Sequence, residues 1–329
     1  MSNINTAIRF VSKPGSSRRT LIDRTRTFRR QDNAAFLADV SLRLKEASRK
    51  PGPAGAAFDP GGVGCIGLMG EYGLLGYGIR CAQEIIRTDR TPSYWSHAFL
   101  VGSGLSEDAE TNRSPEHSPW IWESTLEPAA RFNRFVDRNG VGPRRLADYA
   151  PSGFDLFSPH CVPNIAILAI ALTSEERTKI LDRADDPDVD QLHYDLSGLL
   201  GTWYAYLGDR AQQINPLTQG NAIYCSAYAQ LAYDAAGLDL APGAHQKNTS
   251  PEHIWQAFKY LRPAFQIMDP ATGVLLQRPM LGFYCVRDRA CVVAPVGKKV
   301  PRGIRAIVHE LESSRNRRRS SEGKRRSRD

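Results

Sequence analysis

The 329-residue chain lacks the long hydrophobic runs that membrane-spanning helices need. Such a helix takes roughly 18 or more apolar residues, whereas the longest apolar segment, Ile165 to Leu172, has the length of a buried strand. The N-terminal segment MSNINTAIRFVSKPGSSRR also lacks the hydrophobic region of a secretory signal peptide. We therefore expect no transmembrane segment and a cytoplasmic location by default, with any export following a leaderless route.

Cysteine is scarce: the six residues, at positions 65, 81, 161, 225, 285 and 291, are scattered and form no CxxC motif. They do not make the disulfide framework of a small secreted domain, so we expect reduced thiols. They also lack the spacing of a structural zinc site. Cys285 and Cys291 are instead expected to flank a hairpin turn at Arg287 to Arg289.

Acidic residues are few at the two ends of the chain, and the net charge is +8. Residues 1–55 hold 12 Lys or Arg against 4 Asp or Glu, and residues 313–329 hold 8 against 2, so the ends account for +14 and the remaining body for −6. A mildly acidic body argues against a basic binding groove on the folded domain. The basic ends are expected to remain solvated or to contact nucleic acid, an anionic membrane or an acidic partner.

The pattern along the chain predicts three regions and no internal repeat. Residues 1–61 form a basic, largely disordered region with one helix near 33–48 and a Pro/Gly linker. Residues 62–296 form a compact domain, and residues 297–329 end in a basic disordered tail. An apolar fraction of 41% supports a sizeable core.

Hydrophobic periodicity in the middle region predicts a mixture of strands and helices. The expected strands are 63–69, 95–101, 120–124 and 165–172, with further strands between 263 and 296. The expected helices are 74–86, 174–184, 194–207, 225 to about 236, and a short helix from 251 to about 258. Thr173 with Glu176 forms a capping box that opens one helix, and Ser250 with Pro251 opens another.

Cys225 lies in the first turn of the helix expected within NAIYCSAYAQLAYDAAGLDL, residues 221–240. Bulky residues recur there at helical spacing, and Gly237 stands where a left-handed C-cap residue is needed. The unpaired N–H groups and the positive end of the helix dipole favour a thiolate over a thiol at this position. Cys225 is therefore a candidate nucleophile, and the alternative is a small buried apolar residue.

His97 and Glu123 are the candidate partners of this cysteine. Alternation in the strand 95–101 places His97 on one face with Val101, and Glu123 lies in the strand 120–124. If the two strands pair antiparallel with residue numbers summing to about 220, His97 faces Glu123. A slip of one residue would put these two side chains on opposite faces.

A carboxylate that orients an imidazole makes the base that a cysteine nucleophile requires. Cys225, His97 and Glu123 would then act as nucleophile, general base and acid, and orienting group, while N–H groups at the helix start could supply part of an oxyanion hole. Taken singly, His97 also fits a half-buried hydrogen-bonded histidine, and Glu123 an edge-strand glutamate. The rival base, His160, has no carboxylate at strand spacing. A zinc site of His97, His117 and Glu123 is a minor alternative.

Seven short segments stand in a recognisable order along the chain. They are GCIGLMGEYGLLGYGIRCAQEII at 64–86, SHAFLVG at 96–102, WIWES at 120–124, GVGPRRLADY at 140–149, YDLSGLL at 194–200, YCSAYAQLAYDAAGLDL at 224–240 and SPEHIWQAF at 250–258. Their order and spacing resemble the circularly permuted papain-like hydrolases, the YiiX-like relatives of the NlpC-type cell-wall peptidases. The match covers roughly residues 62–262 and leaves out both basic ends.

The resemblance implies a papain-like α+β fold, in which a small antiparallel sheet packs against the nucleophile helix, with the catalytic domain within residues 62–296. It assigns Cys225 as nucleophile, His97 as base and Glu123 as the group that orients the base. It also implies amide chemistry on a peptide or cell-wall peptide. The long acidic loop from Ser103 to Pro119 departs from the family's pattern and is an expected lid.

Three aromatic residues, Tyr94, Trp95 and Tyr224, flank the expected site. They are candidate substrate-binding residues, with packing as the alternative for at least two of them. We expect neither a cofactor nor a metal, and a peptide, cell-wall or lipid-derived acyl substrate.

The leading hypothesis is a cysteine hydrolase that forms an acyl-enzyme at Cys225, since thiolate chemistry serves amides, esters and thioesters alike. One alternative is a lipid acyltransferase, phospholipase or thioesterase like the lecithin-retinol acyltransferase relatives, which usually carry a second histidine where Glu123 stands. The basic ends could bring such an enzyme to anionic lipid by electrostatics alone. The other alternative is a non-catalytic protein that binds through its basic ends.

Overall fold

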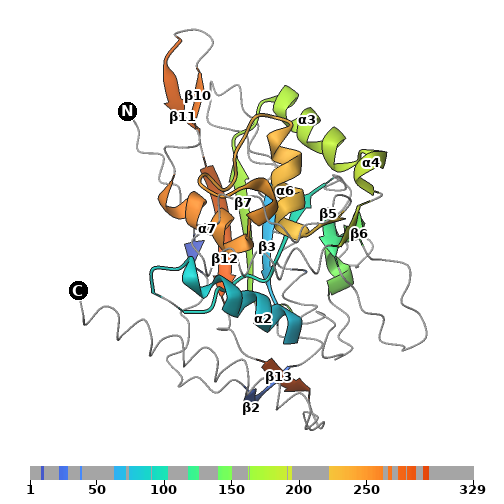
Figure 1. Cartoon of the computed structure of the whole chain (residues 1–329), viewed down its shortest axis with the longest axis vertical. Coiled ribbons are helices and arrows are strands. Elements are labelled where there is room, and N and C mark those ends of the chain that lie inside the picture. Colours follow the sequence, from blue (N-terminus) through green and yellow to red (C-terminus); the bar gives the residue numbers. More distant parts are fainter. Residues whose placement is uncertain are drawn as a thin grey trace.

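The computed structural model describes much of the middle region and parts of the ends. The described residues are 9–10, 22–28, 38, 63–71, 74–89, 91–102, 118–125, 140–149, 162, 164–190, 192–194, 222–261, 266–268, 273–278, 280–286 and 292–295. They form a mixed α+β structure with one large, mainly antiparallel sheet and several helices (Figure 1). The α+β class predicted from the sequence is therefore confirmed.

A seven-stranded sheet forms the centre of the fold (Figure 1). Its strands, in spatial order, are β1 (Arg9–Phe10), β12 (Met280–Val286), β7 (Asn164–Ile170), β3 (Ile66–Gly70), β4 (His97–Val101), β5 (Trp120–Thr125) and β6 (Gly140–Arg145). All neighbours pair antiparallel except β1 and β12, which pair parallel. The four strands predicted between residues 63 and 172 are all present, with ends within three residues of the predicted ones.

Both faces of this sheet are buried, because successive strand residues point to opposite sides. In β4, Ala98 and Leu100 belong to one hydrophobic cluster, whereas Phe99 and Val101 belong to another. Gly67 on β3 lies opposite Phe99, and a Cβ added to it would stand 1.9 Å from Cζ of that ring. The glycine therefore lets the aromatic ring pack directly on the neighbouring strand.

Helices cover the sheet and bring the nucleophile candidate to it. They are α2 (Leu74–Ala82), α3 (Ser174–Ala184), α4 (Pro187–Asp190), α6 (Cys225–Asp234) and α7 (Pro251–Tyr260), with 3-10 turns at Gln83–Ile85, Leu146–Tyr149 and Gln246–Asn248. Helix α6 packs against β4, β5 and α3. Its Ala227, Tyr228 and Ala232 are buried in the same cluster as Ala98 and Leu100. The helix that begins at Cys225 thus lies against the strands that carry His97 and Glu123.

Among the residues that the structure describes, three pairs of strands lie outside the large sheet. They are β2 (Ile22–Phe28) with β13 (Val292–Pro295), β8 (His193–Tyr194) with β9 (Ala222–Ile223), and β10 (Gln266–Met268) with β11 (Leu275–Gln277). The first two pairs are parallel and the third is antiparallel. The pair β8 and β9 leads directly into α6.

Short-range sequence signals placed the helix ends correctly. Thr173 Oγ1 accepts the backbone N–H of Glu176 at 3.1 Å, and Glu176 Oε2 accepts the N–H of Thr173 at 2.9 Å, which is the predicted capping box. Ser250 caps α7 in the same way, with His253 as its reciprocal partner. Gly237 has a φ of +71°, the left-handed conformation expected after α6.

Two short segments of the N-terminal region lie in strands. Strand β1 stands at the edge of the large sheet and β2 pairs with β13, since these neighbours offer unpaired backbone groups. Apart from these strands and residue 38, residues 1–61 lie outside the described ranges, so the largely disordered region stays a prediction. The turn expected at residues 287–289 lies outside the described ranges, but the described strands on either side of it, β12 and β13, do not pair with each other as a hairpin requires. Strand β12 pairs with β1 and β7, and β13 pairs with β2 instead.

Strand β6 was not predicted. It contains Pro143, which cannot donate to a ladder and therefore weakens a strand signal. Among the described strands, β6 is the last of the sheet and pairs with β5 alone, so its outer side needs no ladder bond. An edge position is where a strand tolerates proline.

Several expectations concern residues outside the described ranges. They are the helix near 33–48 apart from residue 38, the loop 103–117, residues 195–207 of an expected helix, and the tail 297–329. Tyr194, expected at the start of that helix, lies in β8. Within the described residues, no helix is both long and apolar enough to cross a bilayer.

Candidate active site

Glu123 occupies the centre of a buried polar cluster and is only 1% exposed. Its Oε2 lies 2.7 Å from Nε2 of His97 and accepts the hydroxyl proton of Tyr149 at 2.7 Å, while Oε1 lies 3.0 Å from Nε of Arg144. Burial opposes ionisation, but His97 and Arg144 outweigh it and lower the pKa of Glu123. Partners on β4, β6 and the following 3-10 turn therefore hold the carboxylate in its charged form.

His97 stands between Glu123 and Cys225 and is 6% exposed. Nε2 of the ring lies against Glu123, and the side chain of Cys225 is a second hydrogen-bond partner of the ring. Burial disfavours the charged ring, but the charges of Cys225 and Glu123 outweigh burial and raise the pKa of His97 well above its usual value. The three residues assigned to the site from the sequence thus lie together.

Cys225 is the first residue of α6, as predicted, and is 3% exposed. The preceding residue, Tyr224, has extended backbone, and no side chain caps the helix start. Helices α3 and α7 both begin with complete capping boxes. The first-turn N–H groups of α6 are therefore left without the side-chain acceptor that the other two helices supply.

The register that joins β4 to β5 differs from the predicted one. Val101 lies opposite Ile121, so paired residue numbers sum to 222 rather than about 220. Pro119, the partner expected for Val101, has no N–H to place in a ladder, which favours the shifted pairing. A shift of two residues preserves the alternation, so His97 and Glu123 remain on one face and meet diagonally.

The three aromatic candidates for substrate binding have clear packing contacts. Trp95 is fully buried and packs edge-on against a tryptophan of α7 with ring centroids 5.1 Å apart. Tyr224 is buried, and its hydroxyl donates to a backbone carbonyl at 2.6 Å. Tyr94 is half-buried, and the Arg87 guanidinium lies 4.6 Å from its ring centroid. These contacts favour the packing alternative stated for at least two of them.

Arg144 and Tyr149 belong to the cluster but were missed in the sequence. Both lie in GVGPRRLADY, a segment of the family resemblance to which no side-chain role was given. Arg144 is buried, and its guanidinium also lies 5.5 Å from the centroid of the Tyr149 ring. Burial and the nearby charge of Glu123 raise the pKa of Tyr149 well above its usual value, so the hydroxyl remains a donor.

A second carboxyl group, that of Glu71, lies beside the cluster and was also missed. It follows β3 directly and is buried, and its backbone N–H donates to Oγ of Ser96 at 3.1 Å. Burial raises the pKa of Glu71 to about 7, with His97 opposing this effect and Glu123 adding to it. Unlike Glu123, this carboxyl group changes its charge near neutral pH.

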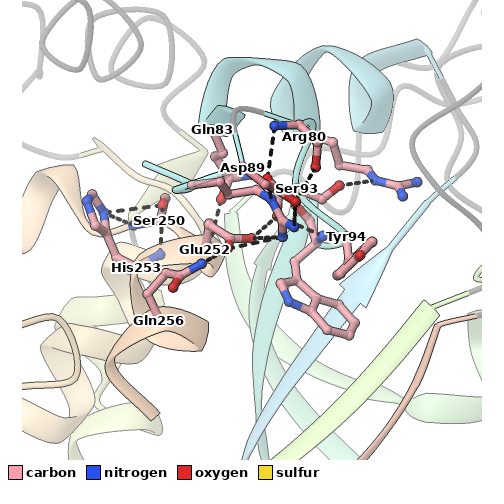
Figure 2. Close-up of polar contacts among 12 residues, drawn as sticks. Arg80, Gln83, Asp89, Ser93, Tyr94, Ser250, Glu252, His253 and Gln256 are labelled. Atoms are coloured by element: carbon pink, nitrogen blue, oxygen red, sulfur yellow. Dashed lines mark hydrogen bonds and ion pairs between the residues drawn. The ribbon is translucent and has the colours of Figure 1, made fainter. Parts of the chain in front are cut away.

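A separate buried network holds the segment that leads into β4 (Figure 2). Glu252, in the first turn of α7, is fully buried and accepts the hydroxyl of Ser93 at 2.6 Å. Its carboxylate lies 3.4 Å from Nη1 of Arg87, and its backbone N–H donates to Gln83 Oε1 at 2.8 Å. Burial raises the pKa of Glu252 in spite of Arg87. The network therefore ties α7 to a residue four positions before His97.

No group of three His, Cys, Asp or Glu side chains within the described ranges could hold a metal ion. His117, named in the zinc alternative, and His160, the rival base, lie outside those ranges. Within the described ranges, Cys65, Cys81 and Cys225 form no disulfide.

Comparisons with protein-family profiles, with curated proteins and with solved structures gave no match to this chain.

Proposed function

We propose that this protein is a cysteine hydrolase, arranged like the circularly permuted papain-like peptidases, that cleaves an amide bond through an acyl-enzyme at Cys225. The observation that carries the proposal is the unbroken line of contacts from Cys225 through His97 to Glu123. The raised pKa of His97 favours a proton on the ring, which supports a thiolate–imidazolium pair. A cysteine that served only as a small apolar core residue would need neither partner.

In the proposed acylation step, Cys225 Sγ forms a bond to the substrate carbonyl carbon while the carbonyl π electrons move to oxygen. The tetrahedral intermediate then collapses, the C–N bond breaks, and His97 donates its proton to the leaving amine. In deacylation, the neutral imidazole takes a proton from water as the water oxygen attacks the thioester carbon. The proton passes to Sγ when the C–S bond breaks. Glu123 stays ionised throughout and orients the ring.

The start of α6 supports stabilisation of the oxyanion in this mechanism. Its first-turn N–H groups have no side-chain cap, and they lie at the positive end of the helix dipole. N–H donors that face the developing negative charge stabilise the transition state more than the ground state. A carbonyl oxygen bound there would sit beside the carbon that Cys225 attacks.

The substrate class follows from the resemblance and from Glu123. The resemblance favours a peptide or cell-wall peptide amide, although the same steps would cleave esters and thioesters. Glu123 is held by Arg144 and Tyr149 at the position where the acyltransferase alternative usually carries a second histidine. This carboxylate favours the hydrolase over the transferase.

The proposal is tested by the pH dependence of Cys225 alkylation with iodoacetamide, read by peptide mass spectrometry. We expect Cys225 to label rapidly at about pH 6 and His97→Ala to slow the labelling, because the imidazolium stabilises the reactive thiolate. Cys65 is an internal control, since it forms no disulfide within the described ranges and has a similar exposure of 5%. Labelling of Cys225 that is no faster than that of Cys65, or that rises only near about pH 8.5 as for an ordinary thiol, would refute the proposal.

Turnover is then screened over amide, ester and thioester substrates. Cys225→Ala is the negative control, because it removes the nucleophile and leaves His97 and Glu123 in place. We expect activity to require Cys225 and His97 together.

A further inference from the structure

Strand β5 contacts both the candidate base, His97, and the backbone just before the candidate nucleophile, Cys225. On β5, Glu123 points toward His97, and the next residue, Ser124, points to the other side. The Oγ of Ser124 donates a hydrogen bond of 2.7 Å to the backbone carbonyl of Ile223, two residues before Cys225. Ser124 is fully buried. Adjacent residues of β5 therefore fix the base and the backbone that carries the nucleophile.

The other side of the nucleophile is tied to the segment before α7. Ser226, directly after Cys225, is fully buried, and its Oγ donates to the carbonyl of Thr249 at 2.7 Å. The hydroxyl of Tyr224 donates to a second carbonyl of the same segment at 2.6 Å. All three hydroxyls donate to carbonyl oxygens, so none of these bonds occupies an N–H group at the start of α6.

We propose that Ser124 and Ser226 are positioning residues that hold Cys225 in line with His97. This inference rests on the proposed function of Cys225 as a nucleophile. Apolar packing along α6 holds the helix against the sheet but is not directional. Hydrogen bonds have preferred distances and angles, and those made by Ser124 and Ser226 constrain the backbone on both sides of the thiol.

Loss of either hydroxyl should misplace the thiol rather than abolish the fold. A misplacement of about 1 Å lowers the rate of an alignment-dependent reaction by about 10²-fold. We expect Ser124→Ala and Ser226→Ala each to lower the His97-dependent rate of Cys225 alkylation at about pH 6 by about tenfold or more. The pH profile of labelling should also move toward that of an ordinary thiol, because the imidazolium no longer lies beside the sulfur.

Tyr228→Phe is the matched control. Tyr228 lies on α6 one turn beyond Cys225, and its buried hydroxyl donates to the carbonyl of Ala184 at 2.9 Å. The variant removes the same kind of bond from the same helix, away from the thiol, and should leave the labelling profile of Cys225 unchanged. Ser124→Thr keeps the hydroxyl and should retain the wild-type profile.

The labelling rates of Cys225 and Cys65 together distinguish a misplaced Cys225 thiol from a destabilised protein. Local opening exposes buried thiols, so a destabilised variant should label faster at both Cys225 and Cys65. Slower labelling of Cys225 with unchanged labelling of Cys65 supports positioning. The inference is overturned if the alanine variants label like the wild type, or if Tyr228→Phe slows Cys225 equally. If wild-type Cys225 itself labels no faster than Cys65, the proposed function fails and the positioning inference fails with it.

Discussion

Replacing Glu71 with glutamine should stabilise the protein at pH 8 and have a much smaller effect at pH 5. Burial raises the pKa of Glu71 from 4.5 to about 7, with His97 and Arg80 opposing this effect and Glu123 adding to it. Because the folded state holds this proton more tightly, the unfolded chain ionises first as the pH rises, and stability falls between about pH 4.5 and 7. At about 1.36 kcal/mol for each pH unit between the two pKa values, the loss reaches about 3 kcal/mol above pH 7.

Urea unfolding of the wild type, Glu71→Gln and Glu175→Gln at pH 5 and pH 8 measures this loss. The free energy of unfolding of Glu71→Gln relative to wild type should rise by about 2 to 3 kcal/mol between the two pH values. Packing or hydrogen bonding lost in the variant cancels in this comparison. Glu175→Gln removes the same charge from an exposed ion pair with Lys179 on α3 and should show little pH dependence. A stability difference for Glu71→Gln that is equal at pH 5 and pH 8 would refute the reasoning.

Two further predictions concern the framework of the site. Gly67→Ala should lower the free energy of unfolding by about 1 to 3 kcal/mol or more, because the new methyl group would overlap Phe99. Gly142→Ala, which meets no atom within 4 Å, is its control in thermal unfolding, and equal effects of the two substitutions would contradict the prediction. Glu252→Ala should cost about 1 to 3 kcal/mol, because it leaves the buried Ser93 hydroxyl without its acceptor, whereas Arg87 keeps Asp89 as a partner. A cost in urea unfolding no larger than that of an exposed ion-pair residue would count against it.

The contact of His97 with Glu123 could be predicted because it depends only on the alternation of strand residues. The register was wrong by two residues, yet an even shift leaves both side chains on the same face. The helix ends at Thr173 and Ser250 were predictable for a similar reason, since each cap is decided within four residues.

The remaining members of the cluster could not be predicted, because their contacts join distant parts of the chain. Tyr149 lies 26 residues from Glu123, and Arg87 lies 165 residues from Glu252. Arg144 could not be predicted to be buried, because arginine is usually exposed and its segment has no clear hydrophobic periodicity. The pairing of β13 with β2 was not predicted for the same reason. A turn expected just before β13 favoured its pairing with β12, whereas β13 pairs with a strand near the other end of the chain.

The contacts of β5 have a consequence for variation in chain length. Glu123 lies 26 residues from His97, whereas Ser124 lies 99 residues from Ile223. In an unfolded chain, the entropy of closing a loop grows only with the logarithm of its length, so the longer closure costs about 1 kcal/mol more than the shorter one. Doubling that longer connection would add only about 0.6 kcal/mol. Insertions in the chain between β5 and β9, outside its helices and strands, should therefore accumulate over evolutionary time at little energetic cost, provided that the hydrogen bond of Ser124 to Ile223 is kept.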